Sequence, residues 1–199
     1  MAPFTVNSDR VHVFEDARSF EDWLRQNHAG EPEIWIKMHK KASGLVSIDW
    51  ADAVDVALCW GWIDAIRKSF DKDSFLQRLT PRGKKSIWSK VNVAHVARLI
   101  EEGRMTEHGL RHVEAAQADG RWDNAYAGSK EMKIPPELQS AIDAVPQARA
   151  TFDKLNAQNR FALAFQIGHL KTEAGRRKKI ATFVEMLKRG DTIHPQKMT

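Results

Sequence analysis

The strongest constraint in this 199-residue sequence is a change of periodicity at Gly61. Before it, residues 49–60 place apolar side chains at helical spacing, and Asp49 is positioned to cap the helix. After it, residues 62–70 and 74–82 read as two strands around the turn at 71–73. A helix that ends at a glycine and leads directly into a hairpin predicts an α+β fold.

Further elements flank this block. Residues 34–39 alternate apolar and polar side chains as a strand does, so we expect a small antiparallel sheet. Helical spacing recurs in 88–103, where we expect Val93, Val96, Ala97 and Ile100 to face the core, and again from Thr106. The predicted fold class is α+β: a small antiparallel sheet packed with helices, followed by a C-terminal helical hairpin or bundle.

The sequence predicts two domains. Residues 1–120 form an α+β domain that carries the segments "GWID" and "TPRGKKSIWSKVN". Residues 134–199 form an all-helical module, because the pattern is helical from Pro135 to the glycine at 190. Between them, residues 118–133 have no sustained period, which is typical of a linker.

The net charge of +5 is unevenly distributed. Residues 66–90 contain eight Lys or Arg against two Asp, and residues 171–189 contain seven against two Glu. Basic segments of this kind favour anionic partners such as phosphates, carboxylates, nucleic acid or anionic lipid. The alternative for the C-terminal segment is a solvated, charged helix face.

Several classes of protein are disfavoured. No stretch approaches the roughly 20 apolar residues of a membrane span, and the N-terminus lacks the pattern of a signal peptide. The single cysteine, Cys59, has no internal disulfide partner, so we expect a cytoplasmic protein and interpret Cys59 as a small buried side chain. No phosphate-binding or dinucleotide motif occurs, and the sequence predicts no cofactor. It defines no oligomeric state.

Residues 62–70 carry charges that a strand would project into specific surroundings. Strict alternation places Trp62, Asp64 and Lys68 on one face. A carboxylate beside an aromatic ring is costly to bury without a cation, so we expect Asp64 to meet Arg78 or Lys68. Two interpretations remain open: a salt bridge that stabilises the hairpin, or an oriented cation that faces an anionic ligand.

The segment "TPRGKKSIWSKVN" concentrates cations and hydroxyls at a predicted helix start, where free N–H groups attract anions. The competing interpretation is simple capping by Ser86 or Ser89, with solvated lysines. We predict that a small anionic ligand binds in a pocket built by residues from this segment and the hairpin. These candidate residues are Trp60, Trp62, Asp64, Arg67, Arg78, Thr80, Lys85, Ser86, Trp88 and Asn92.

Three other kinds of function have weaker support in the sequence. His108 and His112 share a helix face but have no further ligand at metal-site spacing, so we interpret them as surface histidines and predict no metal site. An enzyme is the main alternative, with Asp64 as general acid or base and Arg67 or Arg78 holding the substrate. Nucleic-acid binding is a weaker one, because no nucleic-acid-binding motif accompanies the basic residues.

The motif series also resembles a known family. The segments "ALCWGWIDAIRKSFD", "RLTPRGKKSIWSKVN" and "LIEEGRMTEHGL", followed by "PPELQSAI" and "IGHLKTEAGRRKKIATFVEML", are similar to the bacteriocin-protection family, also called YdeI/OmpD-associated. The resemblance runs from about Phe20 to the glycine at 190, with departures at Ala65, where we expect glycine, and Gly175, where threonine is usual. It implies a small α+β fold with a helical tail and a role in bacteriocin or stress protection, but no established reaction.

Overall fold

The helix–glycine–hairpin block forms as predicted. In the computed structural model, which describes residues 6–128 and 131–197, helix α2 (Trp50–Cys59) begins at the Asp49 cap and is followed by Gly61 with a φ of 73°. Strands β3 (Trp62–Ser69) and β4 (Ser74–Pro81) then pair antiparallel. The left-handed φ is accessible to glycine at little cost, which allows the chain to reverse here.

The sheet has four strands in the order β1-β2-β4-β3. Strand β2 (Ile34–His39) pairs antiparallel with β4, whereas the short β1 (Val11–His12) pairs parallel with β2. The sheet is therefore mixed rather than wholly antiparallel. The α+β class and the C-terminal helices are confirmed.

The chain divides into two compact units, Met1–Tyr126 and Ala127–Thr199. Two parts of the predicted segments, residues 1–5 of the N-terminus and 129–130 of the linker, lie outside the described residues, as do residues 198–199. The sequence-based domains, 1–120 and 134–199, stay a prediction of which segments fold independently.

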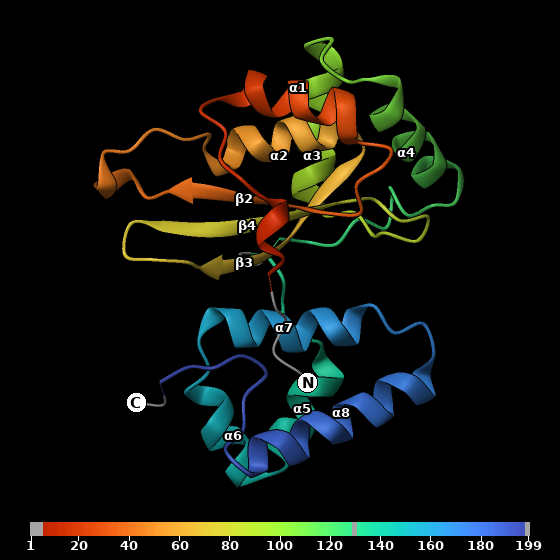
Figure 1. Ribbon diagram of the computed structural model, residues 1–199. Helices are drawn as coiled ribbons and strands as arrows, with labels where there is room; N and C mark the ends of the chain where they lie inside the picture. The colour runs from red at the N-terminus through yellow and green to blue at the C-terminus, as the bar shows by residue number, and fades with distance from the viewer. Residues whose placement is uncertain (1–5, 129–130, 198–199) are drawn as a thin grey trace. The chain divides into compact units, whose positions relative to one another are not determined.

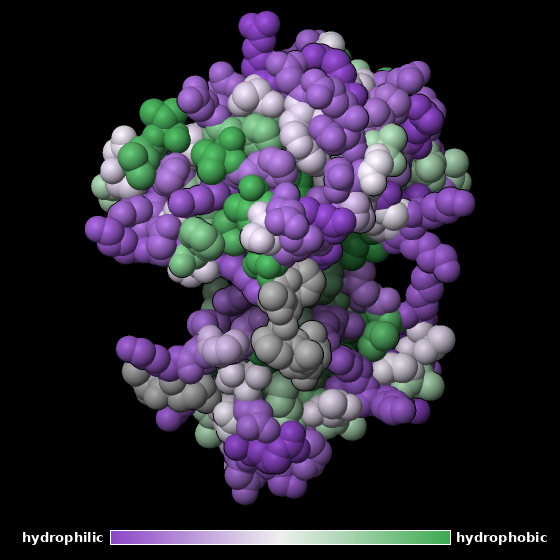
Figure 2. All heavy atoms as spheres, viewed as in Figure 1, coloured by the Kyte–Doolittle hydropathy of each residue, from purple (hydrophilic) through white to green (hydrophobic). Residues whose placement is uncertain are grey.

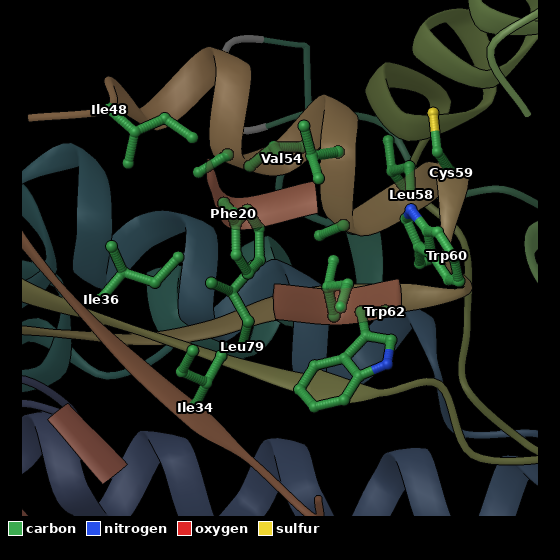
Figure 3. Close-up of a cluster of buried hydrophobic side chains, with 14 of the residues drawn as sticks. Phe20, Ile34, Ile36, Ile48, Val54, Leu58, Cys59, Trp60, Trp62 and Leu79 are labelled. Carbon is green, nitrogen blue, oxygen red and sulfur yellow. The ribbon is translucent and has the colours of Figure 1, made fainter. Parts of the chain in front are cut away.

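Helix α2 is the centre of the N-terminal unit. It contacts α1 (Ala17–Asn27), α3 (Lys90–Glu101), α4 (Glu107–Ala118) and β3. Figure 1 shows α1, α2 and α3 lying over one face of the sheet. The residues from Ala53 to Cys59 are buried without exception, so α2 is enclosed on all sides after its exposed first turn. Figure 3 shows Val54 and Leu58 of α2 beside the sheet residues Ile36 and Trp62.

Helix α3 differs in detail from the prediction. Val96 and Leu99 are its buried residues, whereas Ile100 is 46% exposed and Ala97 is also exposed. The buried face follows a spacing of three residues rather than four. The apolar pattern alone left both stripes open, and packing against α2 selects between them.

The start of the predicted linker belongs to the N-terminal unit instead. Tyr126 forms a parallel bridge with Ser89, in which the Tyr126 N–H donates to the carbonyl of Trp88 at 2.9 Å. Trp122 packs edge-on against Trp88, with ring centroids 5.0 Å apart. An aperiodic sequence is compatible with this, because one backbone bridge and one aromatic contact need no repeating pattern.

The C-terminal unit is helical, as predicted. It contains α5 (Pro136–Asp143), α6 (Pro146–Asp153), α7 (Ala157–Gly168) and α8 (Glu173–Lys188). Its apolar core includes Leu138, Leu163 and Leu187. Asn159 is 1% exposed, and its side chain donates to the carbonyl of His194 and accepts from the N–H of the same residue. This pair of bonds ties the segment after α8 to α7.

Polar side chains dominate the face of the molecule seen in Figure 2. Figure 2 shows hydrophilic side chains over most of the viewed face, with apolar ones gathered in places on the N-terminal unit. The exposed apolar side chains there include Leu45, Val46 and Phe70. None of the helices formed by the described residues combines the length and the apolar character that crossing a membrane requires.

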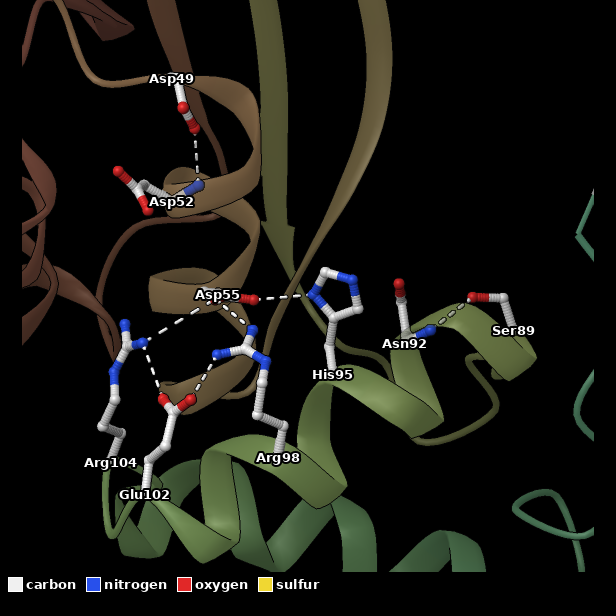
Figure 4. A network of polar contacts seen from close by, with 9 residues as sticks. All are labelled: Asp49, Asp52, Asp55, Ser89, Asn92, His95, Arg98, Glu102 and Arg104. Carbon is white, nitrogen blue, oxygen red and sulfur yellow. Dashed lines mark hydrogen bonds and ion pairs between the residues drawn. The ribbon is translucent and has the colours of Figure 1, made fainter.

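A buried carboxylate joins α2 to α3. Asp55 is 7% exposed, and it accepts hydrogen bonds from His95 Nδ1 at 2.8 Å and from Arg98 (Figure 4). Glu102 accepts from both Arg98 and Arg104, which extends the network to the end of α3. Burial acts to raise the pKa of Asp55, but the hydrogen bonds from Arg98 and His95 outweigh it and hold the pKa below its usual value.

We expect Asp55→Asn to lower the free energy of unfolding by about 2 kcal/mol, because charge-assisted hydrogen bonds to a buried group are lost. Urea denaturation at neutral pH measures this. The matched control is Asp52→Asn in the exposed first turn of α2, where the helix dipole accounts for only about 0.5 kcal/mol.

The pH dependence of the Asp55→Asn effect has a defined sign. A carboxyl whose folded pKa is lowered stabilises the fold above its unfolded pKa, and this contribution disappears as the pH falls through the folded pKa. The difference between wild type and Asp55→Asn should therefore shrink in acid. A difference that stays constant from neutral pH down to pH about 2 would contradict the ionic role of Asp55.

Candidate functional site

A small pocket of about 140 Å³ lies where α1, α2, α4 and the hairpin meet. We call it the histidine pocket. Its lining combines imidazole, indole and guanidinium groups with the turn at Gly61. The lining residues are His28, Trp60, Gly61, Trp62, Pro81, His108, Arg111 and His112. Trp60 and Trp62 are thus the two predicted site residues that reach this pocket.

The pocket exists because α4 docks on the end of α2. The Thr106 hydroxyl and N–H both donate to the carbonyl of Cys59, at 2.6 and 3.2 Å. These bonds satisfy a carbonyl that the end of a helix leaves without an intrahelical partner. A side chain at Gly109 would overlap the carbonyl of Cys59 and lie 2.8 Å from that of Leu58. The glycine of the segment "TEHGL", three residues after Thr106, therefore permits the close approach.

Gly61 makes the second close approach. A Cβ atom at this position would lie 2.6 Å from His112 Cδ2 and 3.0 Å from the carbonyl of His108. Since α4 carries both histidines, the two glycines fix how near the imidazoles come to the end of α2. The pocket therefore requires glycine at positions 61 and 109.

The aromatic groups of the pocket are in mutual contact. Trp60 stacks on His108 with ring centroids 5.5 Å apart and an interplanar angle of 12°. His28 lies 4.1 Å from His108, and its Nδ1 pairs with the carbonyl of Leu24 at 3.0 Å. Trp60 is 8% exposed, yet its indole N–H finds no acceptor among the described residues. A buried donor without an acceptor is rare and favours a ligand atom that accepts.

Positive charge surrounds His112. Burial lowers the pKa of His112, and the guanidinium groups of Arg82, Arg121 and Arg111 lower it further. The imidazole is therefore largely neutral at pH 7. A bound anion would relieve the repulsion and favour the protonated form.

Arg82 is the most deeply buried cation of this region. It follows β4, is 5% exposed, and stacks on Trp88 with the guanidinium carbon 3.5 Å from the ring centroid. Its Nη1 donates to the carbonyl of Ile87 at 3.3 Å, but Nε and Nη2 find no acceptor among the described residues. Burial lowers the pKa of Arg82 to about 10, against the opposing effect of Asp64, so it stays charged at neutral pH.

The positive charge that acts on Asp64 is that of Arg82, whereas the sequence predicted Arg78 or Lys68. Burial raises the pKa of Asp64, and the backbone N–H of its own residue and the charge of Arg82 oppose this only in part. Tyr126 belongs to the same group, because burial and Asp64 both raise the pKa of its hydroxyl. The expectation that Asp64 pairs with Arg78 or Lys68 was wrong.

Strand register explains this correction. Asp64 pairs with Leu79, whereas Arg78 pairs with Trp35 and points to the opposite face. There the Arg78 Nε donates to Glu33 at 2.6 Å.

A β-bulge between Asp64 and Arg67 also breaks the alternation that the sequence predicted. Because of the extra residue, Arg67 shares the Asp64 face and lies 3.7 Å from the ring centroid of Phe75. Lys68 pairs with Leu76 and faces the other way.

The helix start favours the capping interpretation for its serines. Ser89 caps α3, with its hydroxyl accepting from the Asn92 N–H at 3.0 Å. The Ser86 hydroxyl accepts from the Gly83 N–H at 3.0 Å, and the Ser86 carbonyl accepts from Arg121 at 2.7 Å. Lys85 is exposed, as the solvated alternative expected.

The ten candidate residues therefore do not share one pocket. Trp60 and Trp62 line the histidine pocket, Asp64 and Trp88 surround Arg82, and Thr80 pairs with Ile63 within the hairpin. The remaining five are Lys85, Ser86 and Asn92 before and at the start of α3, and Arg67 and Arg78 in the hairpin.

The sequence-based selection also passed over residues that the geometry brings forward. Arg82 stood in the motif "TPRGKK" but was not selected, and His28, Arg111 and Arg121 come from distant segments. The proximity of His108 and His112 was visible, but only as a metal pattern. Among the described residues, no three His, Cys, Asp or Glu side chains are grouped so that they could hold a metal ion.

The fold and the pocket define a class of protein: an α+β unit with a polar, histidine-lined pocket, followed by a small helical unit. Residues 12–112, half of the chain, match the family described as a domain of unknown function, DUF8412, and the chain belongs to this family. Residues 131–190 match the family described as Bacteriocin-protection, YdeI or OmpD-Associated. No curated protein and no solved structure is significantly similar to the chain.

The second match confirms the resemblance to the bacteriocin-protection family, and it locates the matching segment in the C-terminal unit. The motifs around Gly61, which the sequence analysis attributed to that family too, lie in the first match. The name of the first family assigns no activity to the histidine pocket.

We expect Gly61→Ala to destabilise the protein more than Gly103→Ala. Both glycines follow helices and have positive φ values, 73° and 67°, so both substitutions introduce backbone strain of about 1 kcal/mol. Only at Gly61 does the new methyl group meet a neighbour, His112. Overpacking adds about 2 kcal/mol there. Urea denaturation of both variants measures the difference, and equal losses would contradict the close approach of α4.

Proposed function

We propose that the N-terminal unit binds a small anionic ligand in the histidine pocket. The observation that carries the proposal is the buried Trp60 N–H without an acceptor, in a pocket whose charged lining residue is Arg111. The imidazoles of His108 and His112 also line the space, and Arg111 pairs with the Nδ1 of His108 at 3.1 Å. A carboxylate or phosphate oxygen is the matching acceptor.

The surroundings of the pocket support an anion further. Arg82 lies next to the turn at Gly61, because its backbone N–H donates to the carbonyl of Gly61 at 2.9 Å. The charges of Arg82 and Arg121 act on His112, so their potential reaches the pocket. The indoles of Trp60 and Trp62 and the ring of Pro81 supply apolar walls. Small-ligand sites commonly combine apolar walls with a few placed polar groups.

The volume limits the ligand. A space of about 140 Å³ accommodates a compact anion rather than a nucleotide or a peptide. Acetate and phosphate are suitable probes, and acetamide is a neutral match for acetate in shape.

Calorimetric titration of the full chain tests this proposal. We expect acetate or phosphate to bind and acetamide not to bind. The anion should shift the imidazole NMR signal of His112, assigned by its loss in His112→Gln. Binding of acetamide as tight as that of acetate, or an unchanged His112 signal at saturation, would contradict the proposal.

Arg111→Gln should weaken anion binding about tenfold, because a charge-assisted hydrogen bond to the ligand is lost. The matched control is Arg25→Gln, which removes an equally accessible guanidinium from α1 outside the pocket lining. Equal weakening in both variants would indicate general charge attraction instead of a site.

Anion affinity should rise as the pH falls from 8 to 6. His112 has a lowered pKa in the free protein, and protonation adds a cation that the bound anion stabilises. The stability of the free protein changes in the other direction. Because the pKa of His112 is lower in the folded than in the unfolded state, the folded protein loses stability as the pH falls below the unfolded pKa. Titration at three pH values measures the affinity, and a flat profile together with an unchanged Arg111→Gln effect would exclude His112 from the site.

The other sequence-based functions stay predictions. Asp64 has the raised pKa that acid–base catalysis would use, but it does not line the histidine pocket. A stress- or bacteriocin-protection role remains part of this proposal, supported by the family match of the C-terminal unit. The cytoplasmic location stays a prediction from the sequence alone.

A further inference from the structure

A second, larger pocket lies on the N-terminal unit and belongs to no function discussed so far. It has a volume of about 400 Å³ and is formed by the segment before β1, the exposed side of α1 and the loop into β2. We call it the acidic pocket. Its lining residues are Asn7, Asp9, Arg10, His12, Trp23, Asn27, Glu31 and Glu33.

The charge of this lining is negative. Three carboxylates, those of Asp9, Glu31 and Glu33, face one guanidinium, that of Arg10. Arg10 approaches Glu31 and Glu33 only to 3.7 and 3.8 Å, which is beyond hydrogen-bond distance. Its charge is therefore shared between the two carboxylates, of which Glu33 is paired with Arg78 as well.

Glu33 is the buried member of the set. It is 9% exposed, and its Oε2 accepts from the Nε of Arg78 at 2.6 Å. Among the residues that the structure describes, the other oxygen, Oε1, has a long contact of 3.4 Å with the indole N–H of Trp35 and lies 3.8 Å from Arg10. Charge-assisted hydrogen bonds are about 2.8 Å long, so Oε1 retains the capacity to accept a stronger donor.

An aromatic wall completes the pocket. Trp23 and His12 have ring centroids 5.5 Å apart, and both line the space. Indole is the side chain that attracts a cation most strongly through its ring face. The amide of Asn27 donates to the backbone carbonyl of Trp23, one turn earlier in α1, at 2.8 Å, which fixes the Asn27 side chain along the helix.

From the carboxylates, the half-used Glu33 oxygen and the indole wall, we propose that the acidic pocket binds a small organic cation, such as a primary alkylammonium group. The ammonium donates to Glu33 Oε1 and Glu31, and the alkyl chain packs on Trp23. This proposal is independent of the anion site, because the two pockets share no lining residue.

Three probes with one carbon chain test the charge requirement: butylamine, 4-aminobutyrate and butyrate. In calorimetric titrations of the full chain we expect butylamine to bind, 4-aminobutyrate to bind more weakly, and butyrate not to bind at this pocket. Butylamine should shift the indole N–H NMR signal of Trp23, which is assigned by its loss in Trp23→Phe. Binding of 4-aminobutyrate tighter than butylamine would overturn the assignment, since Arg10 would then be the recognising group.

Glu31→Gln should weaken butylamine binding about fivefold, the scale of a half-exposed ion pair. The control is Glu21→Gln, which removes a carboxylate of similar exposure from α1 outside the pocket lining. Equal effects in the two variants, or a butylamine shift confined to the indole signal of Trp62, would overturn the proposal. Loss of acetate binding alone would leave it standing, because that result concerns the histidine pocket.

Discussion

The docking of α4 on the carbonyl end of α2 is the contact on which the candidate site depends. Gly109 allows the α4 backbone to reach the carbonyls of Leu58 and Cys59, and Thr106 completes the hydrogen bonding there. Without this approach, His108 would not stack on Trp60 and the pocket would have no α4 wall. The site therefore depends on two missing side chains, those of Gly61 and Gly109, as much as on the residues that line it.

The order of elements could be predicted because it depends on local patterns. The Asp49 cap, the Gly61 stop and the turn of the hairpin each depend on a few neighbouring residues, and each appears in the structure. The faces of β3 could not be predicted, because a β-bulge between Asp64 and Arg67 inserts one residue and reverses the alternation after it. Nothing in the spacing of "WIDAIRKSF" marks that insertion.

Partners of charged residues were harder still, because they depend on which strands become neighbours. Arg78 was the expected partner of Asp64, but β4 lies between β2 and β3 and presents Arg78 to Glu33 on the other face. Arg82 lies beyond the end of the strand, where the chain turns and no strand rule defines its direction. Pattern reasoning selected the motif that contains Arg82 without selecting the residue.

The net charge of the N-terminal unit does not indicate which ligand charge either pocket prefers. Residues 1–126 contain 18 Lys or Arg and 19 Asp or Glu, whereas residues 127–199 contain 13 and 7, so the excess of positive charge belongs to the C-terminal unit. The N-terminal unit is nearly neutral, yet cations gather around His112 and carboxylates around Trp23. Preference for an anion or a cation must therefore arise from placed side chains rather than from the field of the whole unit.

The two pockets are adjacent through one aromatic contact, which limits how they can influence each other. Trp23 of the acidic pocket meets Trp62 of the histidine pocket edge-on, with ring centroids 6.0 Å apart and an interplanar angle of 85°. Trp62 is 1% exposed and packed within the core, so it has little room to move. A ligand in one pocket can act on the other through charge across this wall, but a change of shape would require repacking of the core. Opposite ligand charges on the two sides would attract through the indoles, and occupancy of one pocket should then favour occupancy of the other.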